Sequence, residues 1–177
     1  MTQRIVIVGG GTGGAVLANR LADKLDLETD ETEVIVVNDG PDHVYKPTFL
    51  YIPFGKRTVD DASQPLVDLL DRRVDLVIDR VEAIDTSAKQ LTMAAGDDLD
   101  YDYLVLATGS KLAPEQVPGL MEGGHHFYDA EGAARLRDAL AEFESGHLVL
   151  SVIGVPHMCP AAPLEFVFRA DEWFREL

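Results

Sequence analysis

The feature that most constrains this chain is a glycine-rich turn placed between two apolar runs near its start. Residues 5–8 (IVIV) and 34–37 (VIVV) are continuous β-branched runs, typical of strands buried on both faces of a parallel sheet. Between them, apolar residues recur at three- and four-residue steps over 15–25, which predicts an amphipathic helix. Strand, turn, helix and strand together predict a right-handed βαβ unit and an α/β fold with a parallel sheet.

The turn itself, residues 9–14 (GGGTGG), fits the dinucleotide-binding pattern G-x-G-x-x-G. In that pattern Gly9 permits the tight turn, Gly11 lets the backbone approach a pyrophosphate, and Gly14 lets the helix pack closely on the strand. The phosphates would face the free N–H groups at the helix start, from Thr12 onward. The alternative is a glycine turn with a structural role alone.

The second strand should end in a carboxylate that holds a ribose hydroxyl, about 20 residues after the turn. The candidates are Asn38 and Asp39. Asn38 at the carboxylate position would be a departure from the pattern. Asp39 could reach the ribose instead, or be a solvated turn residue, and the sequence leaves these possibilities open.

Charge and cysteine content exclude several classes of partner. The 177 residues include 31 Asp and Glu against 15 Lys and Arg, a formal net charge of −16. Such a surface repels nucleic acid and anionic lipid, so neither is an expected partner; it is also typical of proteins adapted to high salt. The one cysteine, Cys159, excludes an internal disulfide framework and favours a reducing compartment. We expect a soluble, cytoplasmic segment without a signal peptide, a membrane span or a metal site.

The rest of the chain predicts more strands and helices. We expect strands over 74–84 (with a break near 79–80), 89–94, 103–107 and 148–153, and helices over 129–144 and from near Pro163. Residues 39–65 lack a clean periodicity but contain several aromatic side chains, so we expect an ordered loop there.

Residues 101–110 (YDYLVLATGS) provide the second strong motif. They resemble the strand that runs under the FAD site in the two-dinucleotide-domain flavoproteins, the pyridine nucleotide-disulfide oxidoreductase superfamily. The resemblance covers essentially the whole chain. It implies FAD as the cofactor, with Ala107, Thr108 and Gly109 at the FAD site and the backbone near Val81 meeting the adenine.

The same resemblance implies a domain plan and a flavin contact. Residues 1–110 would form a Rossmann-type FAD-binding domain, 111–128 a linker, and 129–177 the truncated start of a second, NAD-domain-like unit. Residues 43–47 (HVYKP) resemble the loop that approaches the flavin. Lys46 would then lie near the ring system, where a cation stabilises a reduced, anionic flavin. The alternative is that Lys46 is a solvated loop charge.

The segment 154–166 (GVPHMCPAAPLEF) indicates the electron donor. In NADH-using relatives this region carries a second glycine fingerprint, but here prolines and a cysteine replace it. It resembles the cysteine-bearing loop of sulfide:quinone oxidoreductases, which implies that sulfide reduces FAD through Cys159 and that quinone accepts the electrons. A helix N-terminus after Cys159, and His157 two residues before it, would both favour the reactive thiolate.

Other interpretations remain open. Cys159 could be a buried, inert cysteine, and the family mechanism needs a further cysteine that this chain lacks. The chain could instead belong to a type II NADH:quinone dehydrogenase, be a non-catalytic flavin- or nucleotide-binding fragment, or dock a partner chain through its last helix. Membrane contact, peripheral and at the inner face, is expected only through a later part of a longer protein. The oligomeric state is not predicted.

Overall fold

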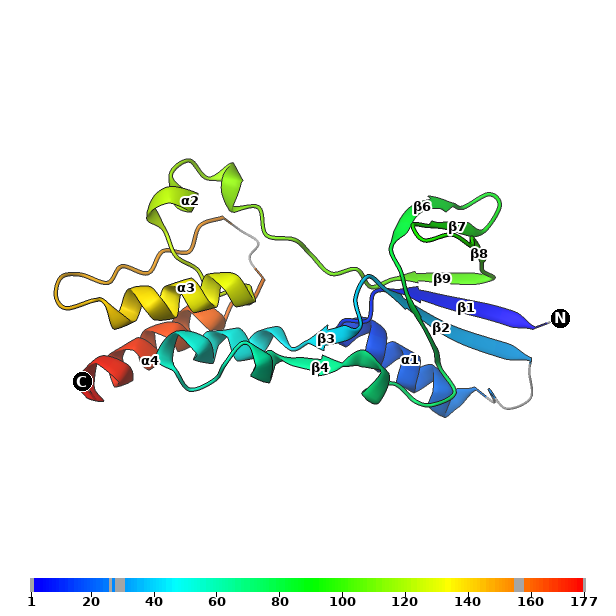
Figure 1. The fold of residues 1–177 in the computed structure, drawn as a ribbon, viewed down its shortest axis with the longest axis horizontal. Coiled ribbons are helices and arrows are strands. Elements are labelled where there is room, and N and C mark those ends of the chain that lie inside the picture. Colours follow the sequence, from blue (N-terminus) through cyan, green and yellow to red (C-terminus); the bar gives the residue numbers. More distant parts are fainter. Residues whose placement is uncertain (1, 26, 28–30, 155–157, 177) are drawn as a thin grey trace. The chain divides into compact units, whose positions relative to one another are not determined.

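The computed structural model describes residues 2–25, 27, 31–154 and 158–176 (Figure 1). The contacts divide the chain into two compact units. The first unit comprises Met1–Tyr45 and Ser63–Lys111, and the second comprises Lys46–Ala62 and Leu112–Leu177. The segment Lys46–Ala62 therefore belongs with the later part of the chain, although the predicted domain plan placed it within residues 1–110.

The first unit contains four parallel strands, β1 (Gln3–Val8), β2 (Thr32–Asn38), β5 (Asp75–Ile78) and β9 (Tyr103–Leu106). They lie in the order β5-β2-β1-β9. The chain moves outward from β1 to β5 and then returns to the other side of β1 as β9. This reversal creates a topological switch point, where open α/β sheets bind their ligands. The predicted parallel sheet is confirmed.

One face of this sheet is covered by helix α1 (Thr12–Lys24). The small side chains of α1 pack against alternate residues of the central strands, including Ile7 and Val36, which are fully buried. Small residues on α1 let the helix axis come close to the sheet, so the βαβ unit has a tightly packed core. The buried residues of α1 are Gly14, Ala15, Ala18 and Ala22.

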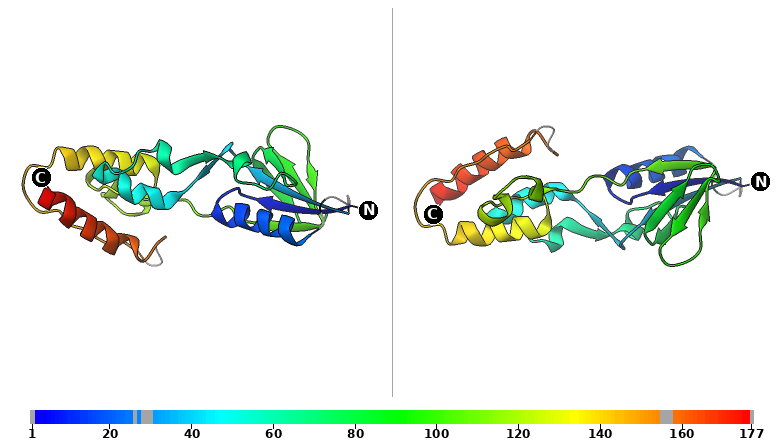
Figure 2. Two further views of the ribbon diagram at one scale, coloured as in Figure 1. Left: turned by 90° about the horizontal axis from the view of Figure 1, so that it is seen from below. Right: turned by 90° about the horizontal axis from the view of Figure 1, so that it is seen from above.

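The other face is covered by a small antiparallel sheet of β6 (Val81–Asp85), β7 (Gln90–Met93) and β8 (Leu99–Asp100). Figure 2 shows α1 and this sheet on opposite sides of the parallel strands. Val6 and Val37 face it and pack with Leu91 and Met93 among others. Since successive strand residues point to opposite faces, both layers together explain why the runs of β1 and β2 are apolar throughout.

A two-stranded antiparallel ribbon, β3 (Asp42–Val44) with β4 (Ser63–Pro65), begins and ends the excursion of the chain into the second unit. The 3₁₀ turn η3 (Leu66–Asp68) follows it and buries Leu66 completely against the α1 layer. The expectation that residues 39–65 are ordered is confirmed, but the antiparallel ribbon of β3 and β4 within this region was not predicted.

The second unit contains the 3₁₀ helix η1 (Lys46–Phe54) and helices α3 (Ala130–Ala141) and α4 (Ala162–Glu176). Helix α3 begins at Asp129, whose Oδ1 accepts a hydrogen bond from the N–H of Gly132 at 2.7 Å. Both helices confirm the predicted ones. Their shared core contains Phe49, Leu50, Ile52 and Phe54 of η1, Ala133, Leu136 and Leu140 of α3, and Phe166 and Ala170 of α4. Shorter elements are η2 (Asp60–Ala62), η4 (Pro114–Gln116) and α2 (Leu120–Gly123).

The predicted strand over 148–153 is wrong. These residues form no strand, and large apolar side chains in this stretch are exposed, with Val149 at 76 % and Val152 at 52 %. A strand needs a neighbour to receive its hydrogen bonds, and no described strand lies beside this segment. The apolar pattern alone could not show that the pairing partner is missing.

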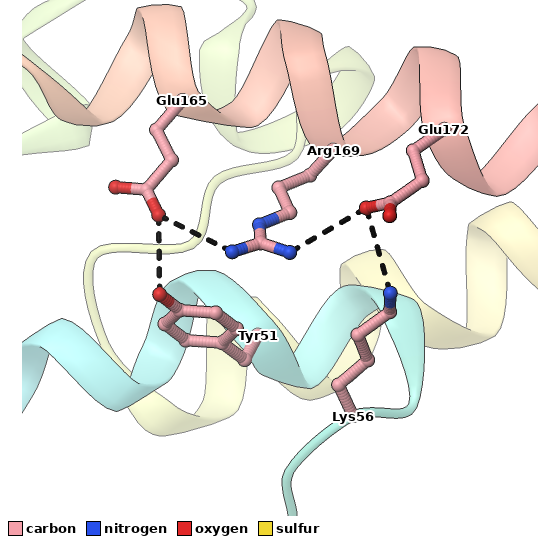
Figure 3. A network of polar contacts seen from close by, with 5 residues as sticks. All are labelled: Tyr51, Lys56, Glu165, Arg169 and Glu172. Atoms are coloured by element: carbon pink, nitrogen blue, oxygen red, sulfur yellow. Dashed lines mark hydrogen bonds and ion pairs between the residues drawn. The ribbon is translucent and has the colours of Figure 1, made fainter.

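A polar cluster joins η1 to α4, as Figure 3 shows. The Tyr51 hydroxyl donates to Glu165 at 3.1 Å, and the Arg169 guanidinium lies 5.0 Å from the centroid of the Tyr51 ring. Arg169 also forms ion pairs with Glu165 at 3.9 Å and with Glu172 at 3.4 Å. Lys56 reaches Glu172 at 3.5 Å.

Within the described chain, none of the helices combines the length and the apolarity needed to cross a bilayer.

Candidate dinucleotide-binding site

The carboxyl ends of all four parallel strands meet at a recess of about 180 Å³ in the first unit. Pockets for whole drug-sized ligands measure ~300–1,000 Å³, so this recess suits one portion of a larger molecule. It lies at the switch point of the sheet, where ligand binding is expected. Its lining residues are Val8, Gly9, Val37, Asn38, Asp39, Asp79, Arg80, Val81 and Thr108.

The glycine turn owes its shape to two close backbone approaches. Gly9 has a φ of 107°, and a Cβ there would lie 2.7 Å from the carbonyl carbon of Ala107. A Cβ on Gly14 would collide with the carbonyl oxygen of Gly9. Since only glycine fits at either position, the turn can bring α1 directly over the end of β1.

The start of α1 presents unpaired N–H groups toward open space. The helix has no acidic residue in its first turn, and Gly11 at its N-cap makes no side-chain cap. Among the described residues, no acceptor meets the N–H groups of Thr12 or Gly13. A Cβ added at Gly11 or Gly13 would touch nothing within 4 Å. This combination of free donors, helix dipole and open space fits a phosphate.

The two candidate ribose ligands have different surroundings. The Oδ1 of Asn38 accepts a hydrogen bond from the N–H of Gly10 at 2.7 Å, and its Nδ2 donates to the carbonyl of Gly40 at 2.8 Å. Asn38 therefore fixes the glycine turn to the end of β2. Asp39 is exposed, lines the recess, and receives no hydrogen bond from any described residue.

Two polar lining residues were not selected from the sequence as ligands, namely Asp79 and Arg80. The Asp79 carboxylate accepts the N–H of Arg80 at 2.7 Å and the N–H of Ala95 at 3.1 Å. The N–H of Asp79 in turn donates to the Asn38 carbonyl at 2.9 Å. A signal was present in the sequence, because these residues interrupt the apolar run of 74–84 where a parallel strand ends.

The remaining predicted ligands of the first unit follow β9 or begin β6. Val81 and Thr108 line the recess. The N–H of Ala107 donates to the Val8 carbonyl at 2.8 Å, which extends the pairing of β9 with β1 to the edge of the recess. Gly109, with a φ of 70°, turns the chain away from the strand. The structure thus gathers Gly9, Asn38, Asp39, Val81 and Thr108 around one recess.

Two predicted site residues lie in the second unit. Lys46 is the first residue of η1, and its side chain is exposed. Cys159 is exposed, so the alternative of a buried cysteine is wrong. Its carbonyl accepts the N–H of Ala162, the first residue of α4, at 3.3 Å, and the predicted helix start after Cys159 is confirmed. His157 lies outside the described residues.

Tyr128 is electrostatically coupled to Cys159. Burial raises the pKa of the Tyr128 hydroxyl above its ordinary value, and the negative charge of a Cys159 thiolate raises this pKa further. The Tyr128 ring stacks on Phe127 at 5.0 Å, and Phe127 stacks on Phe166 of α4 at 5.0 Å. Tyr128 therefore belongs to an aromatic stack that includes Phe166 of α4.

Comparison with known proteins identifies the family. The family described as pyridine nucleotide-disulphide oxidoreductase matches residues 3–154. A sulfide-quinone reductase of Aquifex aeolicus is 31 % identical over 165 residues, which are 91 % of this chain and 37 % of that protein. The mitochondrial sulfide:quinone oxidoreductase of Mus musculus is 23 % identical, over 97 % of this chain and 38 % of its own length. The chain thus spans less than two fifths of these relatives.

Other matches agree at the level of fold. The crystal structure of the sulfide:quinone oxidoreductase from Aquifex aeolicus superimposes with a TM-score of 0.68 at 28 % identity, covering 80 % of this chain and 32 % of that one. An NADH dehydrogenase-like protein of Mycobacterium tuberculosis is 32 % identical over 82 % of this chain and 36 % of its own length. The chain belongs to the pyridine nucleotide-disulphide oxidoreductase family, whose cofactor is FAD.

Proposed function

We propose that this chain supplies the FAD-binding portion of an oxidoreductase that passes electrons from sulfide to quinone. The main support for FAD binding is the recess at the switch point between β1 and β9, next to the free N–H groups of α1. Glycines, free donors and an unpaired carboxylate occur there in the arrangement that an ADP group needs.

Each group of the recess has a separate task in this proposal. The N–H groups of Thr12 and Gly13 bind the pyrophosphate, since they have no acceptor in the part of the chain that the structure describes. Asp39 accepts a hydrogen bond from a ribose hydroxyl, because its carboxylate is exposed and meets no donor among those residues. Val81 provides backbone groups to the adenine, and the partly exposed Val8 lines the same recess. Lys46 is proposed to lie near the flavin ring, where its charge would stabilise an anionic reduced form.

Sulfide is the proposed electron donor, and Cys159 is the proposed site of its oxidation. A Cys159 thiolate and a hydrosulfide ion would form a persulfide, in which a sulfur–sulfur bond forms and the S–H bond of the hydrosulfide breaks. This oxidation releases two electrons and one proton, which a bound FAD would take up. The exposure of Cys159 gives sulfide access to the sulfur atom. The names of the Aquifex and mouse relatives support this donor, and quinone as the acceptor comes from the same names.

NADH is a second candidate donor. Relatives described as NADH dehydrogenase-like are 32 % identical to this chain, as similar as the Aquifex reductase. Residues 154–166 oppose this candidate, since Gly154 is the only glycine among them and a second pyrophosphate-binding turn would require more.

An anaerobic absorption experiment tests both candidates. The purified chain is mixed with FAD, freed of unbound flavin, and titrated first with sulfide and then, in a separate sample, with NADH. We expect retained flavin that sulfide bleaches and NADH does not. The Cys159→Ser variant should retain FAD equally well, but sulfide should bleach it only as slowly as it bleaches free FAD.

Each contrary result contradicts a different part of the proposal. A chain that retains no flavin contradicts the FAD site. Bleaching by NADH supports the second candidate donor. Bleaching by sulfide at an unchanged rate in Cys159→Ser removes the cysteine from the reaction.

A further inference from the structure

Arg80 is held at the rim of the recess by its backbone on both sides. Its N–H donates to the Asp79 carboxylate at 2.7 Å, and its carbonyl accepts the N–H of Ala94 at 2.9 Å. Asp79 is itself anchored to β2 through the Asn38 carbonyl. The direction in which the Arg80 side chain leaves the backbone is therefore fixed by the junction of β5 and β6.

The side chain of Arg80, in contrast, has no protein partner in the described part of the chain. It is exposed, and it forms neither an ion pair nor a hydrogen bond there, although the chain carries an excess of carboxylates. The carboxylate of Asp79 is occupied by two backbone N–H groups. Arg80 is the one cation among the lining residues of the recess.

The recess also has apolar residues in its lining, and a planar base requires such residues against its face. Val8 and Val81, which are both partly exposed, line the same recess as Arg80. A guanidinium is planar and weakly hydrated, and it stacks readily on aromatic faces. The pyrophosphate has separate donors at the start of α1, so this cation is not needed for the phosphates.

We propose that Arg80 covers the adenine ring of the dinucleotide. Its guanidinium stacks on one face of the base, and Val8 and Val81 contact the other face. This assignment rests on the proposed function of the recess and adds a residue that the glycine pattern does not include. The positive charge also offsets the two carboxylates of Asp39 and Asp79 at a site that must accept an anionic ligand.

Titrations of the 177-residue chain with adenosine and with ADP, followed by NMR, test the proposal. Loss of a stacked base contact corresponds to roughly a fivefold or greater loss of affinity, and we expect Arg80→Ala to show it for both ligands alike. Arg80→Lys, which keeps the charge but lacks the planar face, should lose most of the same affinity. Arg72→Ala, at an exposed arginine outside the recess, is the matched control and should bind as the wild type does.

The outcomes separate this proposal from the function on which it rests. If the wild-type chain binds neither ligand, the adenosine recess and the role of Arg80 are both wrong. If it binds both and Arg80→Ala binds them equally well, the role of Arg80 alone is wrong. A loss confined to ADP and abolished by salt would show a phosphate contact and would overturn stacking. Because the Arg80 side chain has no partner among the described residues, unchanged urea midpoints are expected for its variants.

Discussion

Asn38 and Asp39 are adjacent polar residues at the end of β2, and the structure gives them different tasks. The side-chain amide of Asn38 makes two hydrogen bonds: its oxygen accepts from the N–H of Gly10, and its nitrogen donates to the carbonyl of Gly40. An aspartate could accept the first hydrogen bond but could not donate the second. The asparagine therefore suits the internal geometry of the turn, and Asp39 is the exposed carboxylate that we propose as the ribose ligand.

The different surroundings of Asn38 and Asp39 predict different effects of two substitutions, one on stability and the other on binding of FAD. Asn38→Ala removes both hydrogen bonds and should lower the free energy of unfolding by about 1–2 kcal/mol. Asp39→Asn should leave the free energy of unfolding within about 0.5 kcal/mol of wild type, as for other exposed positions, but weaken binding of FAD. Urea unfolding and a flavin titration measure the two effects. A strongly destabilised Asp39→Asn would contradict the assignment.

Asp71 gives a prediction about pH. Hydrogen bonds from the Arg73 guanidinium, at 2.8 and 2.9 Å, and then from the Arg73 backbone N–H hold the pKa of Asp71 far below its usual range. A lowered pKa in the folded state stabilises the fold above the unfolded-state pKa, about 3.9, and this contribution is lost as the pH falls through the folded-state value. Asp71→Asn should therefore be less stable than wild type near neutral pH.

The gap between the two proteins should begin to narrow below about pH 4, because Asp71 then takes up a proton in the unfolded state while it stays ionised in the folded state. Urea midpoints across this pH range provide the measurement. Asp98→Asn is the control, since its exposed carboxylate meets no described donor, and it should show no such gap. A gap that stays constant with pH would mean that Asp71 acts through its shape and not through its charge.

At the scale of elements, η1 and α4 are joined by the cluster around Arg169. Its guanidinium combines the contact with the Tyr51 ring and the ion pairs with Glu165 and Glu172 (Figure 3). We expect Arg169→Met to lower the free energy of unfolding by about 1 kcal/mol, since these contacts are only partly exposed and share one side chain.

Arg175→Met is a suitable comparison on the same helix. Among the described residues, Arg175 pairs only with Asp171, and the two side chains are 77 % and 61 % exposed, so its loss should cost no more than about 0.5 kcal/mol. Denaturant unfolding of both variants distinguishes them. If both variants lose the same free energy of unfolding, the contact between Arg169 and the Tyr51 ring contributes nothing to stability.

The elements differ in how far the sequence could predict them. The strands and α1 of the first unit carry their own periodicity, and the turn of residues 9–14 follows from the backbone approaches that only glycine allows. The helical form of η1 was not predictable, because Phe49, Ile52 and Phe54 are buried by contacts with α3 and α4 far along the chain. The error at 148–153 has the same origin, since an apolar run does not specify its neighbour.

The candidate site was predictable to a similar extent. Gly9, Asp39 and Thr108 were found because each follows a recognisable strand. Arg80 was not selected, because the role proposed for it rests on the lack of a partner among the described residues, which only the arrangement of neighbouring loops can show. The choice between Asn38 and Asp39 likewise depended on hydrogen bonds that a sequence does not display.

For the whole molecule, the net charge of −16 predicts a response to salt. Raising NaCl from about 0.1 M to about 1 M shortens the Debye length from ~10 Å to ~3 Å and screens repulsion among the carboxylates. We expect the urea midpoint to rise over this range, and a neutral osmolyte at equal osmolarity serves as control for effects of solvent exclusion. A midpoint that falls with salt would contradict the proposed adaptation to high salt.

The path of the chain between the units limits how the protein can be divided. It leaves the first unit after Tyr45, returns at Ser63 and leaves again after Lys111. No single cut can therefore yield two self-sufficient modules. A fragment ending at Lys111 would retain η1 but lose α3 and α4, and would expose Phe49, Ile52 and Phe54 to water. Exchange of either unit with a homologue as a cassette needs two junctions within the first 63 residues and a third near residue 111, all made together.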